Sequence, residues 1–164
     1  MPIHRLRKFL DDKRIKYTVI CHSTAYTAQE IAQSAHVSGF QIAKTIVIVT
    51  MEGKTALVVL PAPYRINFSS LKEKLGSAGV WLASEEEFNE MFPDCETGAM
   101  PPFGNLYSLE VYVDKKLTED KEIAFNACNH RELIKMKYSD FSRLVRPTVL
   151  DLTYEPESLH CVQK

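Results

Sequence analysis

Hydrophobic and polar residues follow helical spacing at the start of the chain and strand-like spacing in much of the remainder. Apolar residues over positions 2–13 recur every three or four residues, which predicts an amphipathic helix, and residues 17–21 form a short β-type run. Thr27 is followed three residues later by Glu30, a spacing typical of a capping box. The helix that begins there is expected to end at Ser38-Gly39.

The same criteria predict the other elements. Residues 42–50 are β-branched almost throughout and are separated from a second such run by a turn at 51–54, so the pair predicts a hairpin. Ser84 and Glu87 form another capping box, and Pro93 ends that helix. Altogether we expect strands at 42–50, 55–60, 81–83, 107–113, 122–127 and 132–136, helices at 67–75, 84–92 and 139–145, and a loop at 94–105.

The order of these elements mixes hairpins with helices and contains no repeated strand–helix–strand unit. It predicts a mixed α/β (α+β) fold in which a mainly antiparallel mixed sheet is surrounded by helices. A length of 164 residues suits one compact domain. We expect that domain to span residues 1–153 and the tail, residues 154–164, to be poorly ordered.

Composition narrows the class of protein. Hydrophobic residues make up 45% and charged residues 25%, as in soluble globular proteins. The sequence has neither a run of ~18 apolar residues nor a secretory signal, so we expect a cytoplasmic protein without a membrane partner. A net charge of −1 argues against strong attraction to DNA. Residues 1–16 nevertheless carry six basic and two acidic side chains, either as a phosphate-facing patch or as a solvated helix face.

The four cysteines stand at positions 21, 95, 128 and 161 and include no C-x-x-C pair. In a cytoplasmic chain they are expected to be reduced, buried thiols, and their neighbouring histidines lack zinc-ligand spacing. The sequence also lacks the glycine-rich motifs that bind nucleotides. We therefore expect neither a metal nor a cofactor.

Lys44 interrupts an otherwise apolar strand. With a period of two it shares a face with Ile42, Ile46 and Ile48. An ammonium group on that face either extends to water at a sheet edge or is a cation placed for a ligand.

Two further segments also break the local pattern. The loop from Gly98 to Gly104 combines glycines, which permit close approach of the backbone to a ligand, with two stiffening prolines. It is either a rigid connector or a source of backbone N–H groups for a carbonyl or oxyanion. His130 ends a polar turn and is either exposed or an acid–base or hydrogen-bonding group. Because Cys128 stands two residues earlier, a Cys–His hydrolase is a further alternative.

Taken in order, these motifs resemble the YbaK/prolyl-tRNA synthetase-associated editing-domain family over residues 1–150. Residues 17–22 and 26–30 are similar to the family's opening strand and second helix. Ala43-Lys44-Thr45 is similar to the strand that bears its hallmark lysine, and residues 98–104 to its glycine–proline loop. Asn126-Ala127 with His130, and then residues 138–141, resemble its closing segment.

This resemblance implies a fold built around a barrel-like sheet and an activity, the hydrolysis of the ester between a wrong amino acid and tRNA, commonly proline tRNA. The chain has no room for a synthetase, so it would act in trans. Its implied partners are the acceptor 3′ end of mischarged aminoacyl-tRNA and either prolyl-tRNA synthetase or an elongation factor. The ester is already reactive, so the site needs mainly positioning, oxyanion stabilisation and size exclusion.

The resemblance also assigns roles to residues. Lys44 would orient the charged 3′ end, backbone N–H groups at Gly98 would hold the carbonyl, and His130 would line the pocket and help to reject the cognate amino acid. A substrate hydroxyl or thiol, or bound water, would supply the base. The other residues expected to contact substrate are Tyr26, Thr45, Ala99, Met100, Pro101, Pro102, Phe103, Gly104, Asn126 and Cys128.

Three of these positions depart from the family pattern or vary within it. Cys128 stands where the family often has glycine, while Thr45 and Met100 vary among members. The choice among alanine, cysteine, serine and threonine therefore stays open. The main alternative function is a non-catalytic module that binds the aminoacyl or tRNA end for a synthetase, because a fold does not imply a function.

Overall fold

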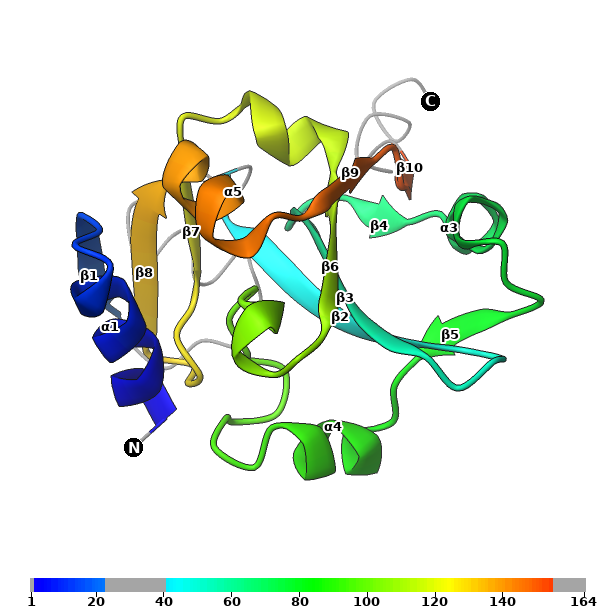
Figure 1. Ribbon diagram of the computed structural model, residues 1–164, viewed down its shortest axis with the longest axis horizontal. Helices are drawn as coiled ribbons and strands as arrows, with labels where there is room; N and C mark the ends of the chain where they lie inside the picture. The colour runs from blue at the N-terminus through cyan, green and yellow to red at the C-terminus, as the bar shows by residue number, and fades with distance from the viewer. Residues whose placement is uncertain (1, 23–40, 155–164) are drawn as a thin grey trace, which may run out of the picture.

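A five-stranded mixed sheet is the largest unit of the computed structural model, which describes residues 2–22 and 41–154 (Figure 1). Its strand order is β5-β2-β3-β6-β9. β2 is antiparallel to both β5 and β3, whereas the β3–β6 and β6–β9 pairs are parallel. The strands are β5 (Val80–Leu82), β2 (Ala43–Thr50), β3 (Thr55–Pro61), β6 (Glu110–Asp114) and β9 (Thr148–Leu150).

Two smaller sheets accompany it. Antiparallel strands β1 (Tyr17–Cys21), β8 (Glu132–Lys137) and β7 (Glu122–Asn126) form one, and β4 (Arg65–Ile66) with β10 (Thr153–Tyr154) forms the other. A parallel bridge between Ile42 and Ala124 joins the three-stranded sheet to the five-stranded sheet. The predicted mixed α/β fold is confirmed, but the described strands form separate sheets and no closed barrel.

The helices begin and end largely where capping residues predict. α3 (Phe68–Leu75) has Asn67 as its N-cap and Gly76, at φ 63°, as its C-cap, and α4 (Glu85–Met91) has the expected capping box. α1 (Pro2–Asp12) lies beside the three-stranded sheet, and α5 (Tyr138–Val145) packs near β8 (Figure 1). Short 3₁₀ turns occupy η2 (Gly104–Leu106) and η3 (Lys115–Glu119). In the described ranges no helix is long and apolar enough to cross a membrane.

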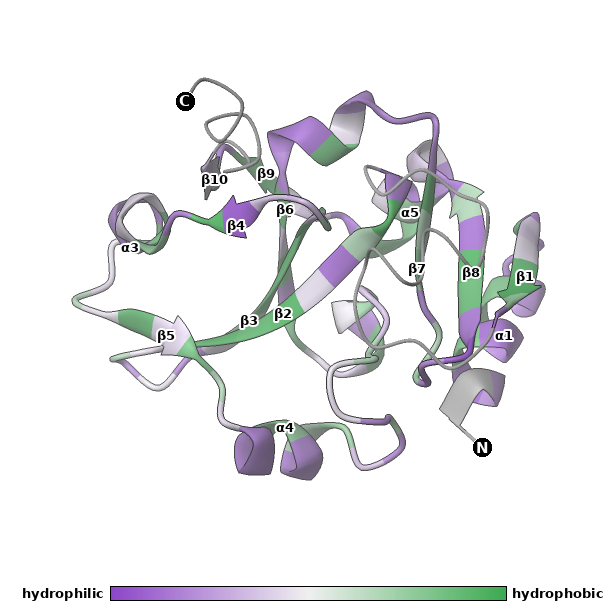
Figure 2. Ribbon diagram, turned by 180° about the vertical axis from the view of Figure 1, so that it is seen from behind, coloured by the Kyte–Doolittle hydropathy of each residue, from purple (hydrophilic) through white to green (hydrophobic). Residues whose placement is uncertain are grey.

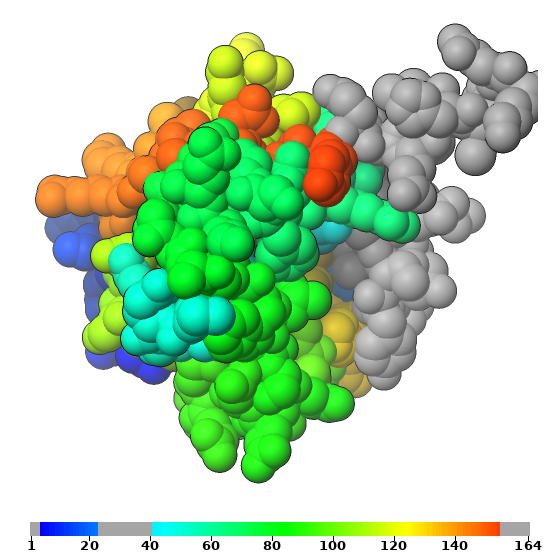
Figure 3. Space-filling model, turned by 90° about the vertical axis from the view of Figure 1, so that its right-hand side faces the viewer, coloured from blue at the N-terminus to red at the C-terminus, as the bar shows by residue number. Residues whose placement is uncertain are grey.

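Hydrophobic clusters cover both faces of the five-stranded sheet. The main cluster fills the space toward α1, α5 and the three-stranded sheet, and Phe103 is its aromatic centre. The ring centroid of Phe103 lies 6.1 Å from that of Phe9, 5.5 Å from that of Phe125 and 5.6 Å from that of Phe141. The second cluster lies beneath α3. Figure 3 shows the corresponding outer side, where green residues of α3, β5 and α4 surround the cyan tip of the β2–β3 hairpin.

Burial on both faces corrects one predicted strand. The alternation over 107–113 predicted a half-buried strand, but β6 begins only at Glu110 and its next four residues are all buried. Val111 and Val113 pack in the main cluster, while Tyr112 packs in the second.

The C-terminal end of the described chain differs from expectation, whereas the basic segment at the start leaves both predicted alternatives open. Arg5 is exposed, its guanidinium donates to the Leu106 carbonyl, and it lies 5.1 Å from the centre of the Tyr107 ring. Tyr154, expected in the poorly ordered tail, pairs with Arg65 in a two-stranded sheet. The helix expected from Thr27 and the tail beyond Tyr154 lie outside the described residues.

Candidate active site

The loop after α4 and the turn between β7 and β8 are joined by paired backbone hydrogen bonds. The Glu96 N–H donates to the Cys128 carbonyl at 2.9 Å, and the Cys128 N–H donates to the Ala99 carbonyl at 2.8 Å. The Ala99 N–H closes a tight turn on the Glu96 carbonyl at 3.0 Å. These bonds hold residues 96–99 and the turn at Cys128 together as one unit.

His130 fastens the same unit through its side chain and its main chain. It is buried, its backbone N–H donates to the Glu96 carboxylate at 3.1 Å, and its Nε2 lies 3.0 Å from the Thr97 carbonyl oxygen. A carbonyl oxygen only accepts hydrogen bonds, so Nε2 carries the hydrogen in this contact. His130 therefore positions the residue directly before Gly98 and is not an exposed turn histidine.

Gly98 has a conformation and surroundings that suit contact with a ligand. Its φ is +82°, and a Cβ added there would meet no atom within 4 Å. Its N–H makes no hydrogen bond to any described residue. Glycine adopts this left-handed conformation without strain, and a backbone N–H that makes no hydrogen bond within the protein can serve a carbonyl oxygen or an oxyanion.

Gly98 borders a hollow of about 440 Å³. One wall is the edge of β2 at residues 45–47, beyond the point where β2 pairs with β5. The opposite wall comes from α4, with Phe88 at its base, and from Thr97. The structure thus brings Thr45 and Gly98, both predicted from the sequence, to one hollow.

Two of the predicted contact residues have a buried polar atom without a hydrogen-bond partner among the described residues: Thr45 Oγ1, which belongs to a residue lining this hollow, and Asn126 Oδ1, which does not. Buried polar atoms are nearly always paired in native proteins, so such exceptions indicate a site that completes its bonds with a ligand or water. Asn126 stands near Lys44 in the sheet. Ile42 and Ala124 form a parallel bridge, and Lys44 and Asn126 each follow two residues later on the two paired segments.

Lys44 is partly buried on β2, opposite Leu60 of β3, on the face of the second hydrophobic cluster. Figure 2 shows the hydrophilic interruption in the otherwise hydrophobic strand β2. Burial, and then the positive charge of Arg65, lower the pKa of the Lys44 ammonium group. A lysine that extends to water along the sheet edge and a cation placed for a ligand would both be partly buried in this way, so the role of Lys44 in binding a ligand stays a prediction.

The rest of the glycine–proline loop is buried and does not line the hollow at Gly98, so its predicted contact with substrate stays a prediction. Met100 and Phe103 belong to the main hydrophobic cluster. A Cβ at Gly104 would lie 2.5 Å from the Leu109 carbonyl oxygen, so glycine is required there for packing. The buried residues of this segment are Ala99, Met100, Pro101, Pro102, Phe103 and Gly104. Tyr26, the remaining predicted contact, lies outside the described residues.

The cysteines differ from expectation. Cys95 and Cys128 form a disulfide that links the loop to the turn, and Cys21 is exposed rather than buried. Sequence spacing gave no sign of this pair, because the two cysteines are 33 residues apart and meet only through the fold. Cys128 has φ +70°, a left-handed conformation that glycine adopts without strain. With its sulfur bonded and His130 directed to Thr97, the Cys–His hydrolase loses its support.

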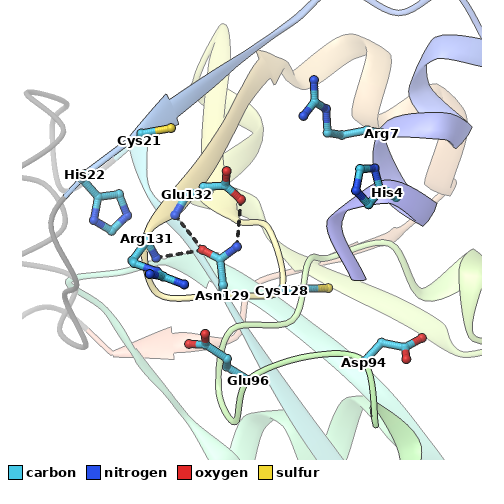
Figure 4. Close-up of a pocket in the computed structure, with 10 residues that line it drawn as sticks. All are labelled: His4, Arg7, Cys21, His22, Asp94, Glu96, Cys128, Asn129, Arg131 and Glu132. Carbon is cyan, nitrogen blue, oxygen red and sulfur yellow. Dashed lines mark hydrogen bonds between the residues drawn. The ribbon is translucent and has the colours of Figure 1, made fainter. Parts of the chain in front are cut away.

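A second hollow of about 650 Å³ lies on the side of α1 and shares no lining residue with the first (Figure 4). Asn129 organises its floor, since its Oδ1 accepts from the N–H groups of Arg131 and Glu132 at 2.8 Å and its Nδ2 donates to the Glu132 carboxylate at 2.8 Å. Its lining contains both acidic and basic side chains, so its charge does not indicate one class of ligand. Among the described residues, no group of three side chains could hold a metal ion.

Sequence reasoning missed several residues of the site. Glu96 and Thr97 hold His130, and Phe88 and Glu85 line the hollow at Gly98. The only signal for the first two is that they directly precede Gly98. The sequence around Glu85 predicts a capped helix start, and the structure has that helix. That Glu85 also lines the hollow depends on where α4 packs, which the local sequence does not show.

The match to known families covers most of this architecture. Residues 22–144 match the aminoacyl-tRNA editing domain. The chain therefore belongs to the aminoacyl-tRNA editing domain family, a class of aminoacyl-tRNA deacylases.

Two relatives make the comparison more specific. A prolyl-tRNA editing protein, ProX, of Acetoanaerobium sticklandii is 28% identical over 142 residues, which cover 84% of this chain and 86% of that protein. A multifunctional Ser/Thr-tRNA deacylase, ProXp-y, of Escherichia coli (strain K12) is 28% identical over 151 residues, which cover 90% of each.

Solved structures share the fold. A proposed trans-editing enzyme for prolyl tRNA synthetase has a TM-score of 0.81 at 23% identity, over 94% of this chain and 98% of that one. The hypothetical protein APE2540 has a TM-score of 0.83 at 22% identity, over 92% of this chain and 99% of that one.

Proposed function

We propose that this protein hydrolyses, in trans, the ester bond between a small amino acid and the 3′ end of a mischarged tRNA. The observation that carries the proposal is the Gly98 N–H, which makes no hydrogen bond to any described residue. Gly98 lines a hollow, and the hydrogen bond from His130 to the Thr97 carbonyl fixes the preceding residue. Preorganised backbone donors of this kind stabilise the charge that develops in acyl transfer.

The chemical steps follow from this geometry. A water molecule adds to the ester carbonyl carbon, and the carbonyl oxygen gains negative charge beside the Gly98 N–H. The bond from carbon to the ribose oxygen then breaks, the ribose oxygen takes one proton of the attacking water, the other proton passes to solvent, and the amino acid leaves as a carboxylate. Lys44 does not line the hollow but stands next to Thr45 with its side chain on the other face of β2, so its ammonium would attract a phosphate of the 3′ end outside the hollow and help to place the ester at Gly98. No side chain is assigned as the base.

Among small amino acids, the structure favours one with a hydroxyl group. The Thr45 hydroxyl is buried beside the hollow and has no partner among the described residues, so it can bond the hydroxyl of serine or threonine. The name of the Escherichia coli relative agrees with this choice. Alanine and cysteine remain the alternatives, with proline tRNA as the first tRNA to test because of the ProX name.

The proposal is tested by deacylation of proline tRNA charged with alanine, cysteine, serine, threonine or proline. We expect release of one or two non-cognate amino acids, no release of proline, and no release by Lys44→Ala. Stability of all five esters, also on serine, threonine and alanine tRNAs, would contradict the proposal.

Thr45→Val removes only the hydroxyl in an isosteric exchange. If the hydroxyl contacts a serine or threonine substrate, kcat/KM for seryl-tRNA should fall by about 10-fold and that for alanyl-tRNA should change little. The comparison of the two substrates with one variant controls for effects on folding. An equal fall in kcat/KM for seryl-tRNA and alanyl-tRNA would show that Thr45 stabilises the strand and does not contact the substrate's hydroxyl.

His130 is expected to act through the loop rather than on the substrate. His130→Ala should lower kcat by about 10- to 100-fold, because Gly98 is then no longer held at its position. His130→Gln, whose side-chain N–H₂ can reach the Thr97 carbonyl, should retain much of the activity. If His130 instead transfers a proton, the glutamine variant would be as inactive as the alanine variant.

Cys128→Gly tests whether the thiol takes part in chemistry. Glycine suits the φ of +70° at this position, so the turn should keep its shape. The exchange also removes the disulfide to Cys95, but the backbone hydrogen bonds of Glu96 and Ala99 to the turn can remain, so we expect deacylation by this variant to stay within about 3-fold of wild type. Complete loss of activity in the folded variant would restore the Cys–His hydrolase as an explanation.

We further propose that binding is limited to the acceptor end and is assisted by prolyl-tRNA synthetase or an elongation factor. A net charge of −1 gives little general attraction to RNA. Titration of the purified protein with uncharged tRNA should show weak, salt-sensitive binding. Tight binding that resists salt would contradict an assisted mechanism.

A further inference from the structure

One exposed acidic residue, Glu85, lines the hollow at Gly98 and has no role in the mechanism above. Glu85 is the single charged side chain among the described residues that line this hollow. It belongs to the first turn of α4, and Phe88, one turn later on the same helix face, forms part of the same lining. The packing of α4 therefore directs this face toward Gly98 and Thr45.

The Glu85 carboxylate is also available for a ligand. Its neighbour Glu87 is engaged in the capping box, where it accepts from the Ser84 N–H at 2.8 Å. Glu86 does not line the hollow. Glu85 itself makes no side-chain hydrogen bond or ion pair within the described part of the chain. The cap is thus complete without Glu85.

The substrate supplies a matching cation. An aminoacyl ester carries an ammonium group on the carbon next to the carbonyl, and α-amino groups have pKa values of about 7.7–8.0, so most are charged at neutral pH. When the carbonyl oxygen lies at the Gly98 N–H, the ammonium nitrogen lies two bonds from the carbonyl carbon, close enough to fall within the same hollow. A carboxylate there forms a charge-assisted hydrogen bond with it.

We propose that Glu85 binds the α-ammonium group of the esterified amino acid, so that the enzyme acts on aminoacyl-tRNA and spares N-acylated forms such as peptidyl-tRNA. This inference rests on the proposed deacylase function and deepens it. Acylation of the amine removes its charge and adds bulk, which leaves the Glu85 carboxylate without its partner. A hydrolase at this site would then distinguish an unused charged tRNA from one that already carries a growing peptide.

The test compares substrates that differ only in the amine. Seryl-tRNA and alanyl-tRNA are paired with the corresponding α-hydroxy esters, glyceryl-tRNA and lactyl-tRNA, in which a hydroxyl of similar size replaces the ammonium group. Wild type should prefer the amine by about 10- to 100-fold in kcat/KM, the range of a hydrogen bond to a charged group. Glu85→Gln should bring the ratio near one by lowering hydrolysis of the amine substrate alone.

Glu86→Gln is the matched control, because it removes a neighbouring charge from the same helix turn without touching the hollow. It should keep the wild-type ratio. An equal ratio in Glu85→Gln and wild type, or wild-type hydrolysis of both esters at equal rates, would overturn the assignment of Glu85 while leaving the deacylase function intact. Failure of wild type to hydrolyse any of the four esters would overturn both.

Discussion

Replacement of Gly98 by alanine is expected to lower kcat for deacylation by about 100- to 1000-fold, the cost of losing one oxyanion donor. The added Cβ itself meets no atom, so the loss would come from the backbone, because alanine disfavours φ +82° and would turn the N–H away from the carbonyl. Single-turnover deacylation with the best substrate of the panel measures it.

Gly53→Ala is a closely matched control. Gly53 has φ +84°, and a Cβ added there would also meet no atom within 4 Å, but it lies in the β2–β3 hairpin turn away from the hollow. Both variants should therefore lose a similar stability, about 1 kcal/mol. Only Gly98→Ala should lose activity. Comparable activity in the two variants would show that the Gly98 backbone takes no part in the reaction.

Lys44→Met is expected to abolish measurable deacylation and, at the same time, to raise the melting temperature. The pKa of Lys44 is lowered in the folded state, so at neutral pH the folded protein holds this proton less tightly than the unfolded chain does. The charged lysine thus costs stability, and the cost declines as pH rises through the lowered pKa. Methionine fills the same volume without charge.

Lys54→Met should show the opposite behaviour. The ion pair with Glu110, 2.6 Å away, raises the pKa of Lys54, so its charge favours the folded state, by less than about 1 kcal/mol for a surface pair. This variant should keep its activity and lose a little stability. If Lys44→Met were instead destabilised and active, Lys44 would be a structural residue.

The fold was predictable from local signals where the chain obeys them. Asn67, Gly76 and Ser84 mark helix ends by their capping chemistry, and the structure places those ends as expected. The predicted half-buried strand at β6 was wrong, because alternation of apolar and polar residues does not show whether a sheet is covered on one face or on both. The separation into three sheets depends on long-range pairings, such as that of β1 with β8, which leave no local trace.

The site was predictable in part for a similar reason. Gly98 and Lys44 stand out because glycine and lysine break the patterns around them. The structure gives Gly98 a left-handed φ and leaves Lys44 partly buried, while their roles in catalysis stay predictions. Glu85 and Glu96 do not stand out, since acidic residues in a helix start and in a polar loop are ordinary. Their positions near Gly98 and His130 arise only when α4 and the β7–β8 turn pack against the loop.

The central claim is that the site at Gly98 cleaves the ester and does not merely bind it. The most direct measurement uses excess enzyme with seryl- or alanyl-tRNA, in parallel with an analogue in which an amide replaces the ester. The account predicts release of the amino acid from the ester, binding of the amide without release, and loss of ester cleavage in Gly98→Ala. Binding of both without release would contradict it and identify the protein as a binding module.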